Sequence, residues 1–351
     1  MTTLSFALAR SLTRLLRPGD EVVVTRLDHD ANISPWLLAV EDSGATVRWV
    51  DLRPDDCTLD LDSLDAAVGP RTKIVAFTLA SNATGTITAA TEIVRRGRSA
   101  GAIVVADAVH LAQHRALDFR SLDVDVLFCS PYKFFGPHLG MMVGRRELLS
   151  AWPAYRVRPS SDEPPGRWET GTMNHEALAG LEAAVGYVAD LGREFGSASN
   201  GDRRSAVLGG MRAVAEHESG LSERFLLGAR DVPGLRLFGI RDVDRIPERT
   251  PTFAARLGDQ HPRDTAEALG RGGVFVWDGN YYALAVMDRL GLEETGGAVR
   301  IGFCHYHTID EVDRVLAALS DLSRPLPRHG GDPYTGGGRR PTPESSVVEG
   351  P

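Results

Sequence analysis

The segment VLFCSPYKFFGPHLG, residues 126–140, begins as an apolar strand and continues into a lysine that stands between two aromatic residues. The chain contains one other lysine, Lys73, so Lys133 does not follow from a composition rich in lysine. An amine between Tyr132 and Phe134 at the end of a buried strand loses contact with water. This lowers its pKa and favours the neutral form that attacks a carbonyl group. The segment therefore indicates a lysine that can form a Schiff base, although a surface lysine on a loop would give the same local pattern.

Apolar runs alternate with helical segments through the first half of the chain. We expect strands at residues 21–28, 46–52, 73–80, 102–108 and 126–130, and helices at 4–17, 32–44, 61–68 and 89–100. Because these runs are continuously apolar, they are typical of a parallel sheet that helices cover on both faces. The sequence therefore predicts an α/β fold with a mostly parallel central sheet.

The second half of the chain has a different pattern, with long helices and short strands. We expect helices at 174–192, 204–230, 263–270, 283–290 and 309–320, and strands at 234–240, 252–257, 273–277 and 298–306. The sequence thus predicts a large α/β domain over residues 1–190 and a smaller C-terminal α+β domain over residues 191–323. Residues 324–351 contain almost no apolar side chains, which predicts a disordered tail.

Composition and charge exclude several classes of function. A net charge of −8 argues against nucleic acid as the main partner. No apolar run approaches the roughly 18 residues of a membrane span, and no signal peptide is recognisable. Cys57, Cys129 and Cys304 have no obvious paired spacing, which favours the reducing cytoplasm. His110 and His114 lie four residues apart but without the acidic residue of a metalloprotease motif, so we expect no metal site.

Polar residues directly follow several of the predicted strands. Ligands of parallel sheets bind beyond the carboxyl ends of the strands, so SNATG (81–85), DAVH (107–110) and SPYK (130–133) should meet at one site. Asp107 comes after five apolar residues, where a carboxylate needs a charged partner such as a protonated pyridine nitrogen. A helix N-cap is the alternative for Asp107. His29 also follows a strand, and it is either a residue that stacks on a flat ring or an ordinary loop histidine.

Six motifs in a fixed order resemble the class V aminotransferases, and within them the cysteine desulfurase family proteins. They are LDHDANISPW (27–36), SNATGT (81–86), VADAVHLAQH (105–114), CSPYKFFGPHLG (129–140), WETGTMN (168–174) and VRIGFCHYHTIDEVDRVL (299–316). The resemblance covers about residues 1–322. It implies a fold type I enzyme that depends on pyridoxal 5'-phosphate (PLP), acts on an amino acid, and forms a homodimer with active sites at the subunit interface.

The resemblance also implies a role for each matching residue. Lys133 would hold PLP as a Schiff base, Asp107 would pair with its ring nitrogen, and His29 would stack over its ring. Further cofactor contacts would come from Thr2, Thr3, Asn82, His110 (where the family usually has glutamine), Ser130 and Tyr132, and from Thr172 of the neighbouring subunit. Substrate contacts would come from Asn82, Trp277, Tyr282 and Arg300. The guanidinium of Arg300 would clamp the α-carboxylate, unless it is an ordinary strand arginine that faces solvent.

The segment GVFVWDGNYYALAV (273–286) departs from the desulfurases, which carry a sulfur-accepting cysteine on a mobile loop there. Tyr282 falls at or near that position, and Trp277 falls where the desulfurases usually have a second arginine. Cys304 lies on the following strand and is expected in the core. We therefore expect β-elimination or carbon–sulfur lyase chemistry on cysteine or a cysteine conjugate, with Lys133 as the base. True cysteine desulfurase, aminotransferase and epimerase activities remain open, as does a catalytically weak or inactive family member.

The beginning of the chain is a second departure. Thr2 and Thr3 precede a helix and match the family's phosphate-binding segment, in which the anion rests on a helix N-terminus. Family members carry several dozen residues before this segment. We therefore expect residue 1 to be an internal methionine, from a gene start placed too late or from a truncated gene.

Overall fold

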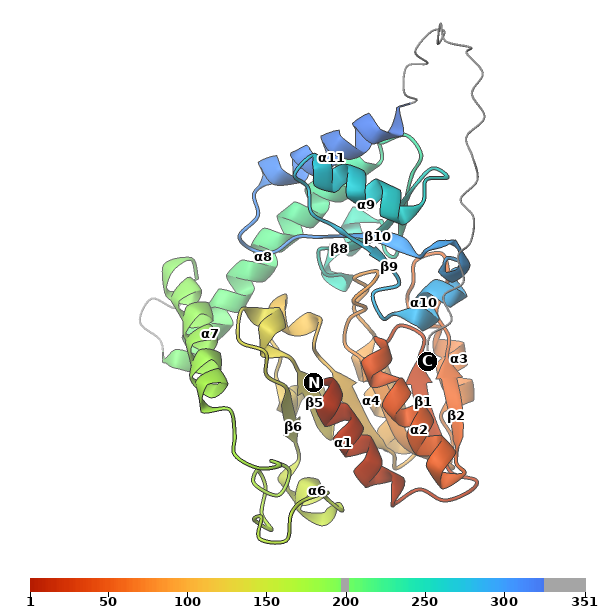
Figure 1. Cartoon of the computed structure of the whole chain (residues 1–351), viewed down its shortest axis with the longest axis vertical. Coiled ribbons are helices and arrows are strands. Elements are labelled where there is room, and N and C mark those ends of the chain that lie inside the picture. The colour runs from red at the N-terminus through yellow and green to blue at the C-terminus, as the bar shows by residue number, and fades with distance from the viewer. Residues whose placement is uncertain (197–201, 325–351) are drawn as a thin grey trace, which may run out of the picture.

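The computed structural model describes residues 1–196 and 202–324 and contains two sheets (Figure 1). The larger sheet has the strand order β2-β1-β3-β4-β5-β6, and the smaller has the order β7-β8-β10-β9. In Figure 1 the larger sheet and its helices form the lower part of the molecule, and the smaller sheet lies above it. The predicted α/β fold is confirmed. The predicted disordered tail falls, apart from Arg324, outside the described residues.

The larger sheet consists of five parallel strands and one antiparallel edge strand. The parallel strands are β1 (Glu21–Thr25), β2 (Thr46–Val50), β3 (Thr72–Thr78), β4 (Ile103–Asp107) and β5 (Val126–Cys129). Strand β6 (Met141–Gly144) pairs antiparallel with β5, and the sequence did not reveal it because it is only four residues long. All five residues of β1 and all four of β5 are buried, which explains their continuously apolar sequences.

Alternate residues of these strands pack into two separate layers of the core. Val22 and Val24 of β1 contact the layer that holds Trp36, whereas Val23 points to the opposite layer with Phe77 and Val104. Successive side chains of a strand point to opposite faces, so a sheet with helices on both sides needs apolar residues at every position. The first layer is covered by α1 (Thr2–Thr13) and α2 (Ser34–Ser43), and the second by α3 (Leu61–Ala67) and α4 (Ala90–Ser99).

The smaller sheet is antiparallel and packs on long helices. Its strands are β7 (Leu235–Phe238), β8 (Thr252–Leu257), β9 (Trp277–Gly279) and β10 (Ala298–Gly302), and the helices packed on it include α9 (Pro262–Arg271) and α11 (Ile309–Ser323). The short helix α10 (Leu284–Arg289) instead packs into the core of the larger sheet. The core of the smaller sheet contains Phe225, Phe253 and Phe303, with ring centroids 4.4 to 6.1 Å apart. Two strand predictions differ most from the structure. The strand expected at 273–277 begins only at Trp277, where Phe275 before it is 90% exposed, and the strand expected at 298–306 ends at Gly302.

Two long helices connect the parts of the molecule. Helix α7 (His175–Glu194) packs against α8 (Arg203–Ala229) so closely that a Cβ atom on Gly192 would lie 1.8 Å from the carbonyl oxygen of Ala206. The predicted domain boundary near residue 190 falls inside α7 and stays a prediction. Over residues 1–196 and 202–324, no helix combines the length and apolar character needed to cross a bilayer.

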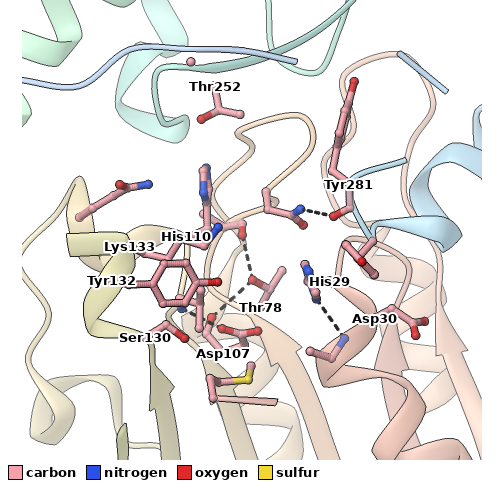
Figure 2. Close-up of a pocket in the computed structure, with 18 of the residues that line it drawn as sticks. His29, Asp30, Thr78, Asp107, His110, Ser130, Tyr132, Lys133, Thr252 and Tyr281 are labelled. Atoms are coloured by element: carbon pink, nitrogen blue, oxygen red, sulfur yellow. Dashed lines mark hydrogen bonds between the residues drawn. The ribbon is translucent and has the colours of Figure 1, made fainter. Parts of the chain in front are cut away.

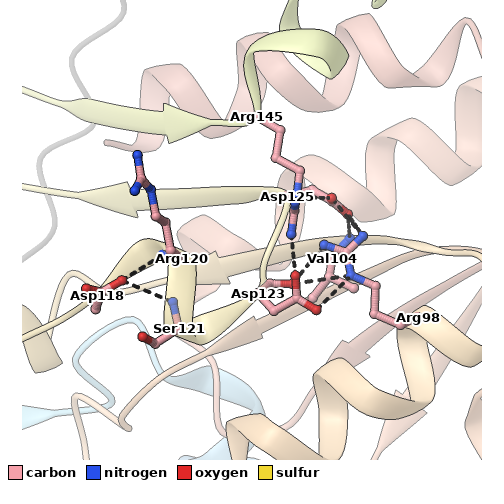
Figure 3. A network of polar contacts seen from close by, with 8 residues as sticks. All are labelled: Arg98, Val104, Asp118, Arg120, Ser121, Asp123, Asp125 and Arg145. Carbon is pink, nitrogen blue, oxygen red and sulfur yellow. Dashed lines mark hydrogen bonds and ion pairs between the residues drawn. The ribbon is translucent and has the colours of Figure 1, made fainter.

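A buried carboxylate ties β4, β5, β6 and α4 together (Figure 3). Asp125 is 2% exposed and accepts hydrogen bonds from the backbone N–H of Val104 at 2.8 Å and from Arg98 at 3.1 Å. The Nε atom of Arg145 lies 3.1 Å from its other oxygen. The neighbouring Asp123 contacts the same two arginines, but its side chain is 58% exposed. Asp125 therefore carries most of the structural role, because its contacts are shielded from water.

We predict that Asp125→Asn lowers the free energy of unfolding by about 3 kcal/mol, because it leaves two partly buried arginines without their carboxylate. The matched change Asp123→Asn should cost less than about 1 kcal/mol, because its ion pairs are exposed to solvent. Denaturant unfolding of both variants measures the difference. Equal losses would show that burial does not distinguish the two carboxylates.

Candidate active site

A cavity of about 760 Å³ lies where the carboxyl ends of β1, β3, β4 and β5 face the smaller sheet (Figure 2). This volume is within the range of small-molecule binding sites. The cavity receives side chains from loops after four strands of the larger sheet, and from β8, β9, β10 and the segments that follow them. The convergence expected for the polar motifs after the strands is therefore observed.

Most of the residues predicted for the site line this one cavity. They are Thr2, His29, Asn82, Asp107, His110, Ser130, Tyr132, Lys133, Trp277, Tyr282 and Arg300. Thr3 and Thr172 are exposed and do not line it within their own chain. The expectation placed Thr172 in the site of a neighbouring subunit, so its role stays a prediction.

Lys133 is presented by a short 3-10 helix, η3 (Pro131–Phe134), directly after β5. The turn is closed by Phe135, which has a left-handed φ of 69°. The Nζ atom of Lys133 lies 5.1 Å from the centre of the Tyr132 ring, and Figure 2 shows both side chains beside Asp107. Burial lowers the pKa of Lys133, the charge of Arg300 lowers it further, and Asp107 partly opposes both. The amine is thus easier to deprotonate than an exposed lysine, as its sequence context predicts.

Asp107 ends β4 and is 3% exposed. Its Oδ1 atom accepts a hydrogen bond of 2.8 Å from the backbone N–H of Val109, so the side chain closes a local turn rather than capping an α-helix. Burial raises the pKa of Asp107 to about 6, although the Val109 hydrogen bond and Lys133 both favour the charged form. A buried carboxylate without an ion-pair partner among the described residues fits a cationic group of a ligand in the cavity.

His29 lies at the other side of the cavity. It precedes the 3-10 helix η1 (Asp30–Asn32), and its Nδ1 atom accepts a hydrogen bond of 3.0 Å from the backbone N–H of Ala31. Burial and the charge of Lys133 lower the pKa of His29 to about 4, so the ring is neutral at pH 7. Its ring stacks on Tyr282, with centroids 5.5 Å apart and an angle of 25° between the planes.

Arg300 and Asn82 are held together at the boundary of the two sheets. Arg300 comes from β10, donates a hydrogen bond of 3.1 Å to the backbone oxygen of Asn82, and lies over the Tyr281 ring at 4.9 Å. The Nδ2 atom of Asn82 donates to the backbone oxygen of Tyr281 at 2.9 Å, whereas its buried Oδ1 has no partner among the described residues. Arg300 therefore faces the cavity rather than solvent, with guanidinium donors left for an anionic group.

His110 is also turned toward the smaller sheet. Its Nε2 atom lies 3.1 Å from the hydroxyl of Thr250, and burial lowers its pKa well below the usual range. A neutral imidazole can donate one hydrogen bond and accept another. It can therefore donate the hydrogen bond that the resemblance expects from a glutamine at this position.

Several residues line the cavity although the sequence did not predict them for the site. They are Thr78, Gln113, His114, Thr252 and Phe303. Cys304 was expected in the core, but it lines the cavity because β10 ends two residues before it. Burial raises the pKa of the Cys304 thiol. Cys129, by contrast, is buried on β5, and burial raises its pKa to about 12. Only the paired histidines of DAVHLAQH gave a sequence signal for His114, and they were considered as metal ligands.

Metal ligands are not gathered at this site. Over the described parts of the chain, no group of three or more His, Cys, Asp or Glu side chains is arranged to hold a metal ion.

The fold and the cavity define a class of protein: a fold type I enzyme with a lysine and a buried aspartate at the ends of adjacent parallel strands. A family model described as aminotransferase class-V matches residues 2–315. The chain belongs to this family, as a cysteine desulfurase-like member, and enzymes of the family use PLP as cofactor.

Relatives of known name support the assignment. The chain is 30% identical to a cysteine desulfurase of Serratia proteamaculans over 324 residues, which cover 89% of this chain and 73% of the relative. It is 32% identical to a probable cysteine desulfurase of Streptomyces coelicolor, with coverage of 86% and 69%. Among solved structures, the apo cysteine desulfurase of Thermococcus onnurineus NA1 has the same fold, with a TM-score of 0.81 at 24% identity over 92% of this chain and 77% of that chain.

The residues of the cavity fit PLP. The carboxylate of Asp107 is buried and the amine of Lys133 has a lowered pKa, while among the described residues Asp107 has no ion-pair partner and Oδ1 of Asn82 has no hydrogen-bond partner. A ring with a protonated nitrogen, an aldehyde and a hydroxyl group has a complement for each of these three features.

We predict that Asp107→Asn stabilises the cofactor-free protein at alkaline pH. Folding raises the pKa of Asp107 from 3.8 to about 6, because the buried site favours the neutral carboxyl group. The stability that comes from this preference is fully present below pH 3.8 and is lost as the pH rises through 6. The asparagine variant avoids this loss. It should be more stable than the parent by on the order of 2 kcal/mol at pH 8, and the difference should shrink toward pH 4.

Denaturant unfolding of the cofactor-free proteins at several pH values measures this difference. Asp125→Asn is the matched control, because it removes an equally buried carboxylate that is ion-paired and should destabilise the protein at pH 8. A stability difference between Asp107→Asn and the parent that does not change with pH would contradict the prediction.

Proposed function

We propose that this protein is a PLP-dependent enzyme that breaks the carbon–sulfur bond of cysteine or a cysteine conjugate by β-elimination. The observation that carries the proposal is the meeting of three groups in one cavity: the amine of Lys133, the buried carboxylate of Asp107 and the guanidinium of Arg300. These are the groups needed to hold PLP, to draw electrons toward its ring and to bind an α-carboxylate.

When bound, PLP supplies an electron sink that weakens the bonds at the substrate Cα atom. The residues of the chain divide the remaining tasks. Asp107 holds the positive charge of the ring nitrogen in place, because its own burial makes an unpaired carboxylate costly. Arg300 orients the substrate through its carboxylate. Lys133, with its lowered pKa, accepts the Cα proton as a base. His29 and Tyr282 supply flat surfaces at the cavity wall.

Elimination is favoured over sulfur transfer by the segment that carries Tyr281 and Tyr282. Both residues have a left-handed backbone, with φ values of 55° and 58°, and Tyr281 is buried whereas Tyr282 is 72% exposed. A phenol at position 282 cannot accept sulfur as a persulfide. Elimination, by contrast, requires no protein thiol. The aromatic residues around the opening also suit a substrate larger than cysteine itself.

Cysteine desulfurase is the second candidate function. It is favoured by the names of the relatives and by the position of Cys304, whose side chain lines the cavity. The raised pKa of this thiol argues against it as a ready nucleophile, because the thiolate is the reactive form.

We also propose that the enzyme acts as a homodimer. Trp277 and Tyr282 line the cavity while 65% and 72% exposed, and Tyr306 is 63% exposed nearby in the chain segment after β10. Large aromatic side chains that remain exposed beside a cavity suit the interface with a second copy of the chain, which would also bring its Thr172 to the site.

Covalent trapping tests the cofactor role of Lys133. After incubation with PLP and reduction with borohydride, we expect the cofactor to be fixed on the peptide that contains Lys133, because a Schiff base is reduced to a stable amine. The variant Lys133→Ala should lose the adduct, whereas Lys73→Ala, which changes an exposed lysine outside the cavity, should retain it. Peptide mass spectrometry gives the answer, and an adduct that survives in Lys133→Ala would contradict the proposal.

The two candidate reactions differ in the fate of sulfur. With S-ethyl-L-cysteine we expect release of pyruvate, ammonia and thiol, and after incubation with L-cysteine we expect no persulfide on Cys57, Cys129 or Cys304. Product assays and mass spectrometry of the intact protein measure both. A persulfide on Cys304 would establish sulfur transfer, and an oxo acid that retains sulfur would indicate transamination.

A further inference from the structure

A buried pair of titratable residues, of which His114 lines the cavity, has no role so far. His114 follows the 3-10 helix η2 (Leu111–Gln113), and Glu218 lies on α8, which runs past the end of the larger sheet (Figure 1). The Nδ1 atom of His114 lies 2.8 Å from Oε2 of Glu218, and the two side chains are 0% and 1% exposed. Two residues 104 positions apart are thus joined by one hydrogen bond in the interior.

The geometry leaves one nitrogen of the imidazole free for the cavity. His114 lines the cavity, its Nδ1 atom is occupied by Glu218, and its Nε2 atom has no hydrogen-bond partner among the described residues. A buried polar atom without a partner is costly, and such atoms are common where a ligand supplies the missing contact. The edge of His114 that remains for a ligand is therefore the Nε2 edge.

The surroundings orient this histidine. Glu218 is a buried acid in contact with Nδ1, which is the arrangement in which a carboxylate positions a catalytic histidine. The other titratable groups close to the pair are Arg115, whose Nη1 donates to the backbone oxygen of His114 at 2.9 Å, His110 with its ring 5.2 Å away, His305, Tyr306 and the thiol of Cys304. Glu218 is thus the carboxylate in direct contact with the imidazole.

We propose that His114 is the acid that protonates the leaving sulfur of the substrate, and that Glu218 is its positioning residue. This inference rests on the proposed elimination. As the Cα–H bond breaks, its proton goes to Lys133; a double bond forms between Cα and Cβ, and the Cβ–S bond breaks with its electron pair on sulfur. The Nε2 proton of His114 passes to that sulfur, so a neutral thiol leaves. The imidazole regains a proton from water.

The test compares two substrates that differ in their need for an acid. An alkyl thiolate is a basic leaving group, whereas chloride is not and leaves without a proton. His114→Gln should therefore slow elimination from S-ethyl-L-cysteine by at least about 100-fold but slow elimination from β-chloro-L-alanine by less than about threefold. Glu218→Gln should show the same selectivity with a loss of about tenfold. His217→Asn, an exposed neighbour on the same helix, should change neither rate.

A second measurement does not depend on turnover. A buried imidazole N–H that donates to a carboxylate should give a low-field proton resonance in the NMR spectrum of the protein as purified. This resonance should be absent from His114→Gln and Glu218→Gln and present in His217→Asn.

Three results would overturn the inference: equal losses on the two substrates, no loss on S-ethyl-L-cysteine, or no low-field resonance in the parent. A failure of the proposed function looks different, because the parent itself would then release no thiol and pyruvate from S-ethyl-L-cysteine, whatever its rate with β-chloro-L-alanine.

Discussion

The burial of a carboxylate at the end of a parallel strand is the constraint on which this site depends. Asp107 lies at the end of β4, which is an inner strand of the larger sheet. It is 3% exposed, and burial raises its pKa to about 6. An unpaired charge in such a place lowers the stability of the protein without ligand. In the proposed function, this cost is offset when the cationic nitrogen of the cofactor pairs with the carboxylate.

The two sheets together position the other groups of the site. Strands β4 and β5 are neighbours, so Asp107 at the end of β4 and Lys133 just after β5 open into the same space. The smaller sheet closes this space from the opposite side and contributes Arg300 through β10. Each sheet thus provides part of the proposed chemistry: the larger one carries the groups proposed to hold the cofactor, and the smaller one carries the arginine proposed to bind a substrate carboxylate.

Helix α8 contributes residues to two regions of the molecule. It contributes Phe225 to the core of the smaller sheet and Glu218 to the contact with His114, so packing and a polar contact are provided by one element. In the proposed elimination, Lys133 handles the proton at Cα, and His114 supplies the proton to sulfur. Two proton-transfer groups with separate supports suit a reaction that breaks two bonds of the substrate.

The sequence by itself determined the alternation of strands and helices, the parallel sheet and the ends at which Asp107 and Lys133 stand, because continuous apolar runs and the residues after them are local features. The tertiary structure alone decided the rest. The edge strand β6 was too short to recognise, Cys304 entered the cavity because β10 ends early, and the contact of His114 with Glu218 joins residues far apart in the chain. Such contacts depend on how helices and sheets pack against one another, and the spacing of residues along a chain does not encode that packing.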